Sequence, residues 1–262
     1  MRLLFLGDIF GRAGRLAVEG LAAEIRRDER VDVIVANGEN VAGGIGITPK
    51  DAQALLAHVD LLTGGNHIWS KSEIVPLLED PNGRILRPLN YPPGAPGRGF
   101  AIVERDGFRL GVVNLEGRIF MKPLDDPFRA ADEAVEKLRG EGVRMILVDL
   151  HAEATSEKWA MGRYLDGRVS AVIGSHSHVQ TADERLLPNG TAFLTDAGMC
   201  GPRDSIIGMK VEGALKRMLS QRPAALKPAE TDVWLHGAIV EIDDDSGRAR
   251  SIARLQRACA LE

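Results

Sequence analysis

The residues best suited to chemistry in this 262-residue chain are two histidines that follow a hydrophobic run. Residues 169–173 are apolar and rich in β-branched side chains, which predicts a buried strand, and a Gly-Ser-His-Ser-His stretch follows at 174–178. Side chains two positions apart point the same way in an extended chain, so we expect His176 and His178 to face one site. Paired imidazoles are good ligands for one metal ion or for two.

Other predicted strands also end in polar side chains. In a largely parallel sheet ligands bind beyond the carboxyl ends of the strands, so these side chains are expected to meet there. Carboxylate, amide and imidazole groups together suit Mn, Fe or Zn better than Ca. More candidate ligands are present than one ion can use, which predicts two metal ions that share a carboxylate. Glu39 is the most natural shared residue. A pair of metal ions of this kind is suited to displacement at a phosphoryl group. The further candidate ligands are Asp8, Glu39, Asn40, Asn66 and His151.

Each candidate ligand also has a structural explanation when taken alone. An aspartate after a strand, as at Asp8, often caps a helix, and the Asn-Gly-Glu-Asn run at 37–40 could form a turn. A single histidine such as His151 often only packs in the core. Five strand ends that carry such groups in one chain favour the metal site.

Alternating strands and helices must position these residues in the first part of the chain. Apolar runs predict strands over residues 3–7, 31–36 and 59–63. Helical spacing predicts a helix over 11–27 and a second one over 48–57, which starts at a Thr-Pro pair. This alternation is typical of a largely parallel sheet with covering helices.

Hairpins become frequent later in the chain. Turn residues at 106–107, 189–190 and 245–247 each separate two runs of strand-like sequence, which predicts three hairpins. A helix is predicted over 126–140, and a buried strand over 145–150 precedes His151. A Pro- and Gly-rich stretch from about 80 to 99 predicts a long irregular loop, and a short helix is predicted over 159–165. We therefore expect an α/β fold in which two mixed sheets pack face to face with helices outside, as a single domain over 1–262.

Composition places the chain among ordinary globular proteins. Hydrophobic residues make up 44% of it and charged residues 27%, and the net charge of −4 argues against a nucleic-acid-coating protein. Cys200 and Cys259 lie in no ligand spacing, nothing near Cys200 marks it as a nucleophile, and both fit a reducing cytoplasm. The apolar start is too short for a signal peptide, and no run is as long as a membrane span. We expect a cytoplasmic protein with neither a membrane nor a stable nucleic-acid partner.

The order of the candidate motifs resembles that of the calcineurin-like metallophosphoesterase superfamily. That family has an Asp near the N-terminus, a bridging acidic residue, Gly-Asn-His, a later single His, and Gly-His-x-His. The resemblance implies a four-layer αββα sandwich, a dinuclear site and phosphoester hydrolysis. The matching residues here are Asp8, Glu39, Gly65-Asn66-His67, His151 and the 174–178 stretch.

Three positions depart from the general family pattern. Phe10 stands where the first motif usually has a His ligand, Glu39 replaces the usual bridging Asp, and Ser175 is inserted before His176. The chain instead resembles the bacterial YmdB-like phosphodiesterases, in which an asparagine after the bridging glutamate supplies the missing ligand, here Asn40. The motifs that carry this resemblance are Gly-Glu-Asn at 38–40, Gly-Asn-His-Ile-Trp at 65–69, Asn-Leu-Glu-Gly-Arg at 114–118 and the loop at 195–202.

The resemblance also implies a role for each site residue. His67 would be the general acid that protonates the leaving oxygen, and a metal-bridging hydroxide would attack phosphorus. The metals would be Fe or Mn, with Zn as an option, and the substrate a cyclic nucleotide, especially a 2′,3′-cyclic one. The first metal would be held by Asp8, Glu39, Asn40 and His178, and the second by Glu39, Asn66, His151 and His176.

We therefore predict a metal-dependent phosphoric diester hydrolase, and several alternatives remain open. One is a metal- and nucleotide-binding regulatory protein with little turnover, and another is a phosphomonoesterase. An amidohydrolase is disfavoured, because those barrels place His-x-His after the first strand and here it comes late. The elaborated middle and the C-terminal hairpins leave room for a homo-oligomer.

Overall fold

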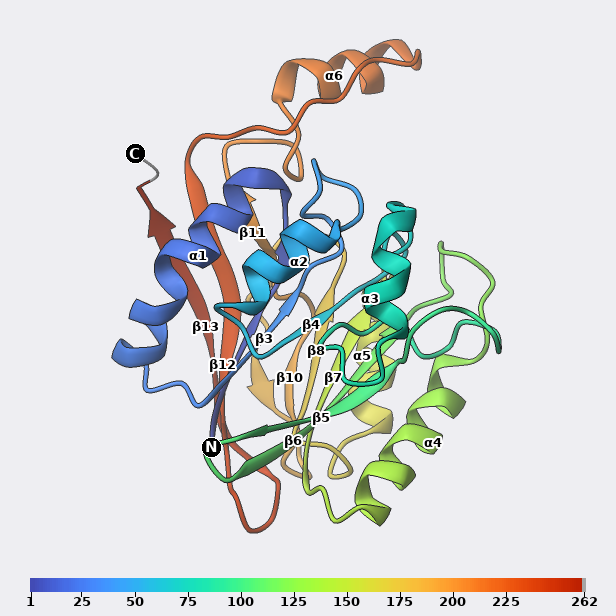
Figure 1. The fold of residues 1–262 in the computed structure, drawn as a ribbon, viewed down its shortest axis with the longest axis vertical. Coiled ribbons are helices and arrows are strands. Elements are labelled where there is room, and N and C mark those ends of the chain that lie inside the picture. Colours follow the sequence, from blue (N-terminus) through green and yellow to red (C-terminus); the bar gives the residue numbers. More distant parts are fainter. Residues whose placement is uncertain (261–262) are drawn as a thin grey trace.

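Two mixed β-sheets pack face to face in the computed structural model, which describes residues 1–260, and helices cover both outer faces (Figure 1). Three hydrophobic clusters fill the three interfaces between these layers. The architecture is the predicted four-layer αββα sandwich. The helices are α1 (Gly11–Asp28), α2 (Pro49–Leu56), the 3₁₀ turn η1 (Ser72–Ile74), α3 (Val75–Glu79), α4 (Pro127–Gly140), α5 (Thr155–Tyr164) and α6 (Val211–Ser220).

The first sheet is built around the N-terminal strand β1. Its strand order is β2-β11-β12-β1-β3-β4. β11 and β1 pair with different parts of β12, and β13 pairs with β12 along its whole length. Strands β1, β3 and β4 run parallel, whereas β12 is antiparallel to β1. The strands of this sheet are β1 (Arg2–Leu6), β2 (Asp8–Ile9), β3 (Val33–Asn37), β4 (Leu61–Thr63), β11 (Met199–Pro202), β12 (Val233–Ile242) and β13 (Ala249–Cys259).

The second sheet has the order β5-β6-β7-β8-β10-β9. Its central strands β6, β7, β8 and β10 run parallel, and antiparallel partners flank them at both edges. Its strands are β5 (Phe100–Arg105), β6 (Phe108–Glu116), β7 (Met145–His151), β8 (Ala171–Ser175), β9 (Arg185–Leu186) and β10 (Ala192–Leu194).

Alternation of side chains along the strands explains why the layers form. In β1, Leu3 and Phe5 pack between the sheets, whereas Leu4 packs on the other face beneath α1 and α2. In β7, Leu147 faces the first sheet and Val148 faces the helices α4 and α5. Strands that are apolar on both faces can be covered on both sides, as parallel sheets require.

Local signals start two helices where the sequence predicts. Thr48 precedes Pro49 at the start of α2, and its Oγ1 accepts a hydrogen bond from the Asp51 amide at 3.2 Å. Asp126 caps α4 by accepting from the Phe128 amide at 2.8 Å. The three predicted hairpins are confirmed as the antiparallel pairs β5–β6, β9–β10 and β12–β13.

Some elements differ from the sequence prediction. Helix α5 begins at Thr155, earlier than the predicted 159, and the sequence analysis did not predict η1, α3 or α6. Helix α6 projects from one end of the molecule (Figure 1), and its Leu215, Met218 and Leu219 are exposed. No helix within residues 1–260 has the length and apolar character needed to span a bilayer.

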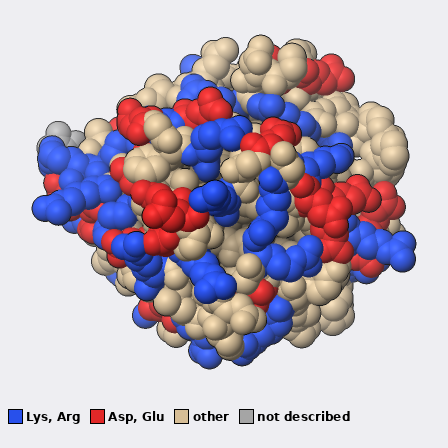
Figure 2. Space-filling model, turned by 90° about the horizontal axis from the view of Figure 1, so that it is seen from below, with Lys and Arg blue, Asp and Glu red and all other residues tan. Residues whose placement is uncertain are grey.

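The carboxyl ends of the parallel strands of both sheets lie at the same edge of the sandwich. β1, β3 and β4 end there in one sheet, and β7 and β8 end there in the other. Figure 2 shows the opposite end, where Lys and Arg side chains are mixed with Asp and Glu. The edge that carries the strand ends is therefore where a site is expected.

Candidate metal centre

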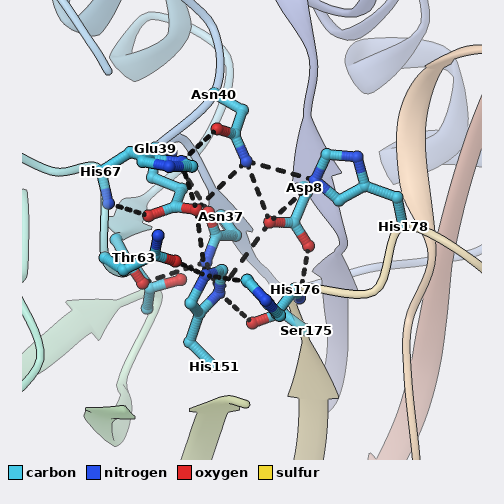
Figure 3. A network of polar contacts seen from close by, with 12 residues as sticks. Asp8, Asn37, Glu39, Asn40, Thr63, His67, His151, Ser175, His176 and His178 are labelled. Atoms are coloured by element: carbon cyan, nitrogen blue, oxygen red, sulfur yellow. Dashed lines mark hydrogen bonds and ion pairs between the residues drawn. The ribbon is translucent and has the colours of Figure 1, made fainter. Parts of the chain in front are cut away.

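The structure brings all eight predicted site residues together at this edge, and Figure 3 labels them all except Asn66. Each lies at one of the two ends of a strand or a few residues beyond it, and both sheets contribute. Asp8 begins β2, Glu39 and Asn40 follow β3, Asn66 and His67 follow β4, His151 ends β7, and His176 and His178 follow β8.

One group of side chains surrounds Asp8. Its Oδ1 lies 3.5 Å from Asn40 Nδ2 and 3.7 Å from His178 Nε2. Asn40 Nδ2 and His178 Nε2 are 3.2 Å apart. These three residues therefore point their polar atoms at one small volume.

A second group surrounds His151. Its Nε2 lies 2.9 Å from Glu39 Oε1, 3.0 Å from Asn66 Oδ1 and 3.1 Å from His176 Nδ1. Ligand atoms of Glu39, His151 and His176 all lie within 4.8 Å of one another, which is the spacing of a metal-binding group. Glu39 Oε1 is also 3.1 Å from Asn40 Nδ2, so this carboxylate touches both groups.

The amide of Asn40 turns its nitrogen toward Asp8 and His178 and its oxygen toward His67. Turning the amide by half a rotation exchanges the two atoms, and the oxygen then faces the volume between Asp8 and His178 where the first metal ion is predicted. The side chain is therefore in position to offer oxygen to a cation.

The charges of the site fit a cation. Asp8 and Glu39 are fully buried, and their ion pairs within residues 1–260 are with histidines rather than with lysine or arginine. Burial opposes the charge of each carboxyl, yet the neighbouring histidines hold the pKa of Glu39 well below its usual range. Burial also opposes charge on His151, but Glu39 and nearby carboxylates raise its pKa to about 10. Buried carboxylates with only oxygen and nitrogen neighbours are a donor set suited to metal ions.

The histidine loop does not have the extended backbone that the sequence analysis expected. Strand β8 ends at Ser175, and His176 and His178 have φ angles of 96° and 64°, in the left-handed region. The two rings therefore reach different groups, His176 the one around His151 and His178 the one around Asp8. Such a backbone is uncommon outside glycine and needs support from its surroundings.

Hydrogen bonds from the loop's own backbone amides to buried carboxylates supply that support. The His176 amide donates to Asp8 Oδ2 at 3.0 Å, and the Ser177 amide donates to Asp196 Oδ2 at 3.1 Å. Asp196 in turn forms a buried ion pair with Lys158 at 2.6 Å. Asp196 lies in the loop at 195–202 that the sequence analysis singled out, and its role there is to hold the histidine loop.

His178 is also fixed from outside the centre. Its Nδ1 lies 3.0 Å from the Ile207 carbonyl oxygen, so it donates there and leaves Nε2 facing Asp8. Phe10 packs edge-on against the His178 ring, with 5.6 Å between the ring centroids. The residue that replaces a ligand in the general family pattern thus buttresses another predicted ligand.

His67 borders the centre without belonging to either group. Its amide donates to Glu39 Oε2 at 2.8 Å, and its Nδ1 lies 3.1 Å from Asn40 Oδ1. The side chain is 36% exposed, unlike the buried His151. It is therefore the histidine of this site most open to a substrate.

The sequence analysis missed polar residues that lie near the predicted ligands. Asp149 accepts hydrogen bonds from Asn37 and Thr63, and Glu153 Oε2 lies 3.2 Å from His176 Nε2. A signal for Asp149 exists in the sequence, because it lies two positions before His151 in one buried strand and so faces the same way.

Comparisons with known proteins show which family the chain resembles over almost its whole length. The family model for YmdB-like proteins matches residues 4–255. The 2′,3′-cyclic-nucleotide 2′-phosphodiesterase of Bacillus subtilis (strain 168) is 45% identical over 257 residues, which cover 97% of this chain and 96% of that protein.

Two solved structures are also similar over almost the whole chain. A hypothetical protein from Thermus thermophilus has a TM-score of 0.92 and 44% identity, with 98% of this chain and 99% of that one covered. A novel phosphatase from Mycoplasma pneumoniae has a TM-score of 0.91 and 29% identity, with 98% and 93% covered.

Proposed function

This chain belongs to the YmdB-like protein family, and on that premise we propose that it is a metal-dependent phosphodiesterase that hydrolyses 2′,3′-cyclic nucleotides. The observation that carries the proposal is the pair of ligand groups that share Glu39. The similarity to the Bacillus subtilis 2′,3′-cyclic-nucleotide 2′-phosphodiesterase supports the substrate class.

We assign the ligands by the two groups. Both groups are built from oxygen and nitrogen donors, so Fe or Mn is the preferred metal and Zn is acceptable. Bound metals supply Lewis-acid chemistry, because they lower the pKa of water to make a nucleophile and neutralise charge on the phosphoryl oxygens. The first metal is assigned to Asp8, Glu39, Asn40 and His178, and the second to Glu39, Asn66, His151 and His176.

His67 is assigned as the general acid. Nδ1 of the ring faces the centre, 3.1 Å from the Asn40 side chain and 3.5 Å from Glu39 Oε1, which leaves Nε2 for the substrate. In the charged ring, Nε2–H then donates its proton to the oxygen that leaves phosphorus. The hydrogen bond from the His67 amide to Glu39 keeps this ring beside the centre.

The proposal extends to the product and the setting of the enzyme. Cleavage of the 2′ ester makes the 2′ oxygen the leaving group and a nucleoside 3′-phosphate the product. We further propose that residues 1–262 form a single domain that acts in the cytoplasm on a small phosphodiester, without a membrane or stable nucleic-acid partner.

Product analysis tests this function. The protein, supplied with Mn²⁺, is incubated with adenosine 2′,3′-cyclic phosphate, and the products are separated by chromatography. Adenosine 3′-phosphate as the main product supports the proposal, whereas intact substrate at every metal tried contradicts it.

A phosphomonoesterase is the second candidate, because the similar Mycoplasma pneumoniae structure is that of a phosphatase. The same experiment separates the two activities. Release of inorganic phosphate from adenosine 3′-phosphate, supplied as substrate, would favour this second function, and its absence would leave the diesterase alone.

A further inference from the structure

Asp149 joins the two sheets beneath the metal centre. It is fully buried in β7, and it receives hydrogen bonds from Thr63 Oγ1 at 2.5 Å and Asn37 Nδ2 at 3.3 Å, both from the first sheet. A third bond, at 2.7 Å, comes from Ser175 Oγ in the neighbouring strand β8. Asp149 belongs to neither ligand group, so its carboxylate serves the residues around it.

The direction of these hydrogen bonds follows from the donors available. An ionised carboxylate only accepts hydrogen bonds, and three donor groups converge on Asp149. Ser175 has one hydroxyl proton and gives it to Asp149 Oδ1. The lone pairs of the serine oxygen then face His151 Nδ1, which lies 2.9 Å away. His151 Nδ1 must therefore carry a proton in order to donate to Ser175.

We propose that Ser175 and Asp149 are positioning residues that hold the proton of His151 on Nδ1 and keep its Nε2 bare for a metal ion. The inference rests on the proposed metal-dependent function. It also gives a role to Ser175, the residue inserted into the Gly-His-x-His motif. Asn37 Nδ2 lies 3.5 Å from the same Nδ1, but it has closer acceptors in Gly64 and Asp149.

The register of the β7 and β8 strands places residue 175 where its side chain can accept a hydrogen bond from His151 Nδ1. Ser175 pairs with His151 in the parallel β7–β8 ladder, which puts their side chains side by side. The neighbouring Gly174 cannot serve, because a Cβ there would lie 1.9 Å from the Thr195 carbonyl oxygen. Loss of the Ser175 hydroxyl would leave both His151 Nδ1–H and Asp149 Oδ1 short of a partner in a fully buried place.

The test compares Ser175→Ala with a matched control. Ser170 in the same segment is also fully buried, accepts from the Ile146 amide and donates to the Gly247 carbonyl, away from the centre. Mn²⁺ affinity is measured by titration calorimetry on the full-length, metal-free proteins. We expect Ser175→Ala to weaken Mn²⁺ binding by about 10–100-fold, as for other groups that orient a metal-bound histidine. Ser170→Ala should lose stability without losing affinity, and Ser175→Thr, which keeps the hydroxyl, should restore binding.

A spectroscopic measurement separates orientation of the ring from a general loss of structure. In the Zn²⁺-loaded protein, the buried Nδ1 proton of His151 should give a slowly exchanging NMR resonance that is lost or shifted in Ser175→Ala and kept in Ser170→Ala. If the alanine variant does not fold, Ser175→Cys replaces it, because cysteine fills the same space with only a weak hydrogen-bonding group. The same loss of Mn²⁺ affinity and of the resonance is expected.

The possible failures are distinguishable. If the wild-type protein binds Mn²⁺, and Ser175→Ala and Ser175→Cys bind it with the same affinity, the positioning role is overturned and the proposed function stands. A wild-type protein that binds no Mn²⁺ would overturn the proposed function and this inference with it.

Discussion

At the scale of single residues, the proposed centre separates buried candidate ligands from a histidine that is open to the outside. His151 is fully buried and faces Glu39, whereas His67 is open to the outside and is tied to the centre through its backbone amide and Nδ1. Sequence neighbours therefore have different roles here, since Asn66 faces His151 and His67 turns toward Asn40.

Replacement of His67 by alanine should lower kcat on a 2′,3′-cyclic nucleotide by about 10²–10⁴-fold, which is the usual contribution of a general acid. Mn²⁺ content should stay at the wild-type level, because His67 is not assigned as a ligand. Hydrolysis of a p-nitrophenyl diester should fall much less, since p-nitrophenolate leaves without a proton. His58→Ala, after α2, is the control; equal losses on both substrates would count against the acid role.

The two cysteines should differ in reactivity. Cys200 is fully buried, and burial raises the pKa of its thiol to about 12, whereas Cys259 is partly exposed. Since the thiolate is the reactive form, the native protein at pH 8 should react with iodoacetamide at Cys259 and spare Cys200. Peptide mass spectrometry measures this, and rapid labelling of Cys200 in the folded protein would contradict its burial.

At the scale of elements, strand ends and their loops decide the geometry of the site. The sequence predicts α2 and α4 well because Thr48-Pro49 and Asp126-Pro127 are local starting signals that the structure uses. It does not predict the left-handed backbone at His176 and His178, because that conformation depends on Asp8 and Asp196, which come from distant parts of the chain.

The buried pair Lys158–Asp196 should be essential for this loop. Lys158→Met leaves the Asp196 carboxylate buried without its cation, so we expect the free energy of unfolding to fall by about 3–5 kcal/mol in urea titrations. Arg203→Met removes one partner of the exposed Arg203–Asp232 pair and should lower the free energy of unfolding far less, because solvent screens an exposed ion pair. Similar losses of unfolding free energy in the two variants would show that the buried pair does not stabilise the protein more than the exposed one.

At the scale of the whole molecule, two sheets pack face to face (Figure 1). One apolar layer lies between them, and the predicted site residues lie at the carboxyl ends of their parallel strands. The order of the motifs along the chain predicts both the sandwich and the set of site residues. It does not predict how the sheets are joined beneath the site, because Asn37, Thr63, Asp149 and Ser175 meet only after both sheets have packed. Pairwise contacts of that kind leave no periodic signal in the sequence.

The apolar layer between the sheets should dominate stability. Phe5 is fully buried in it, so Phe5→Ala should lower the free energy of unfolding by about 3–5 kcal/mol. Urea denaturation followed by circular dichroism measures the change. A loss below about 1 kcal/mol would mean that the sheets do not rely on this layer.

The most direct test of the proposed function combines metal analysis with hydrolysis of a 2′,3′-cyclic nucleotide, on the wild-type protein and on Asp8→Asn. We expect about two metal ions per chain and turnover in the wild type, turnover that EDTA abolishes and Mn²⁺ restores, as for a two-metal site. Asp8→Asn should remain folded and lose both metal and activity. A folded wild-type protein that hydrolyses the substrate equally well with and without EDTA, or an Asp8→Asn variant with full activity, would contradict the metal-dependent mechanism.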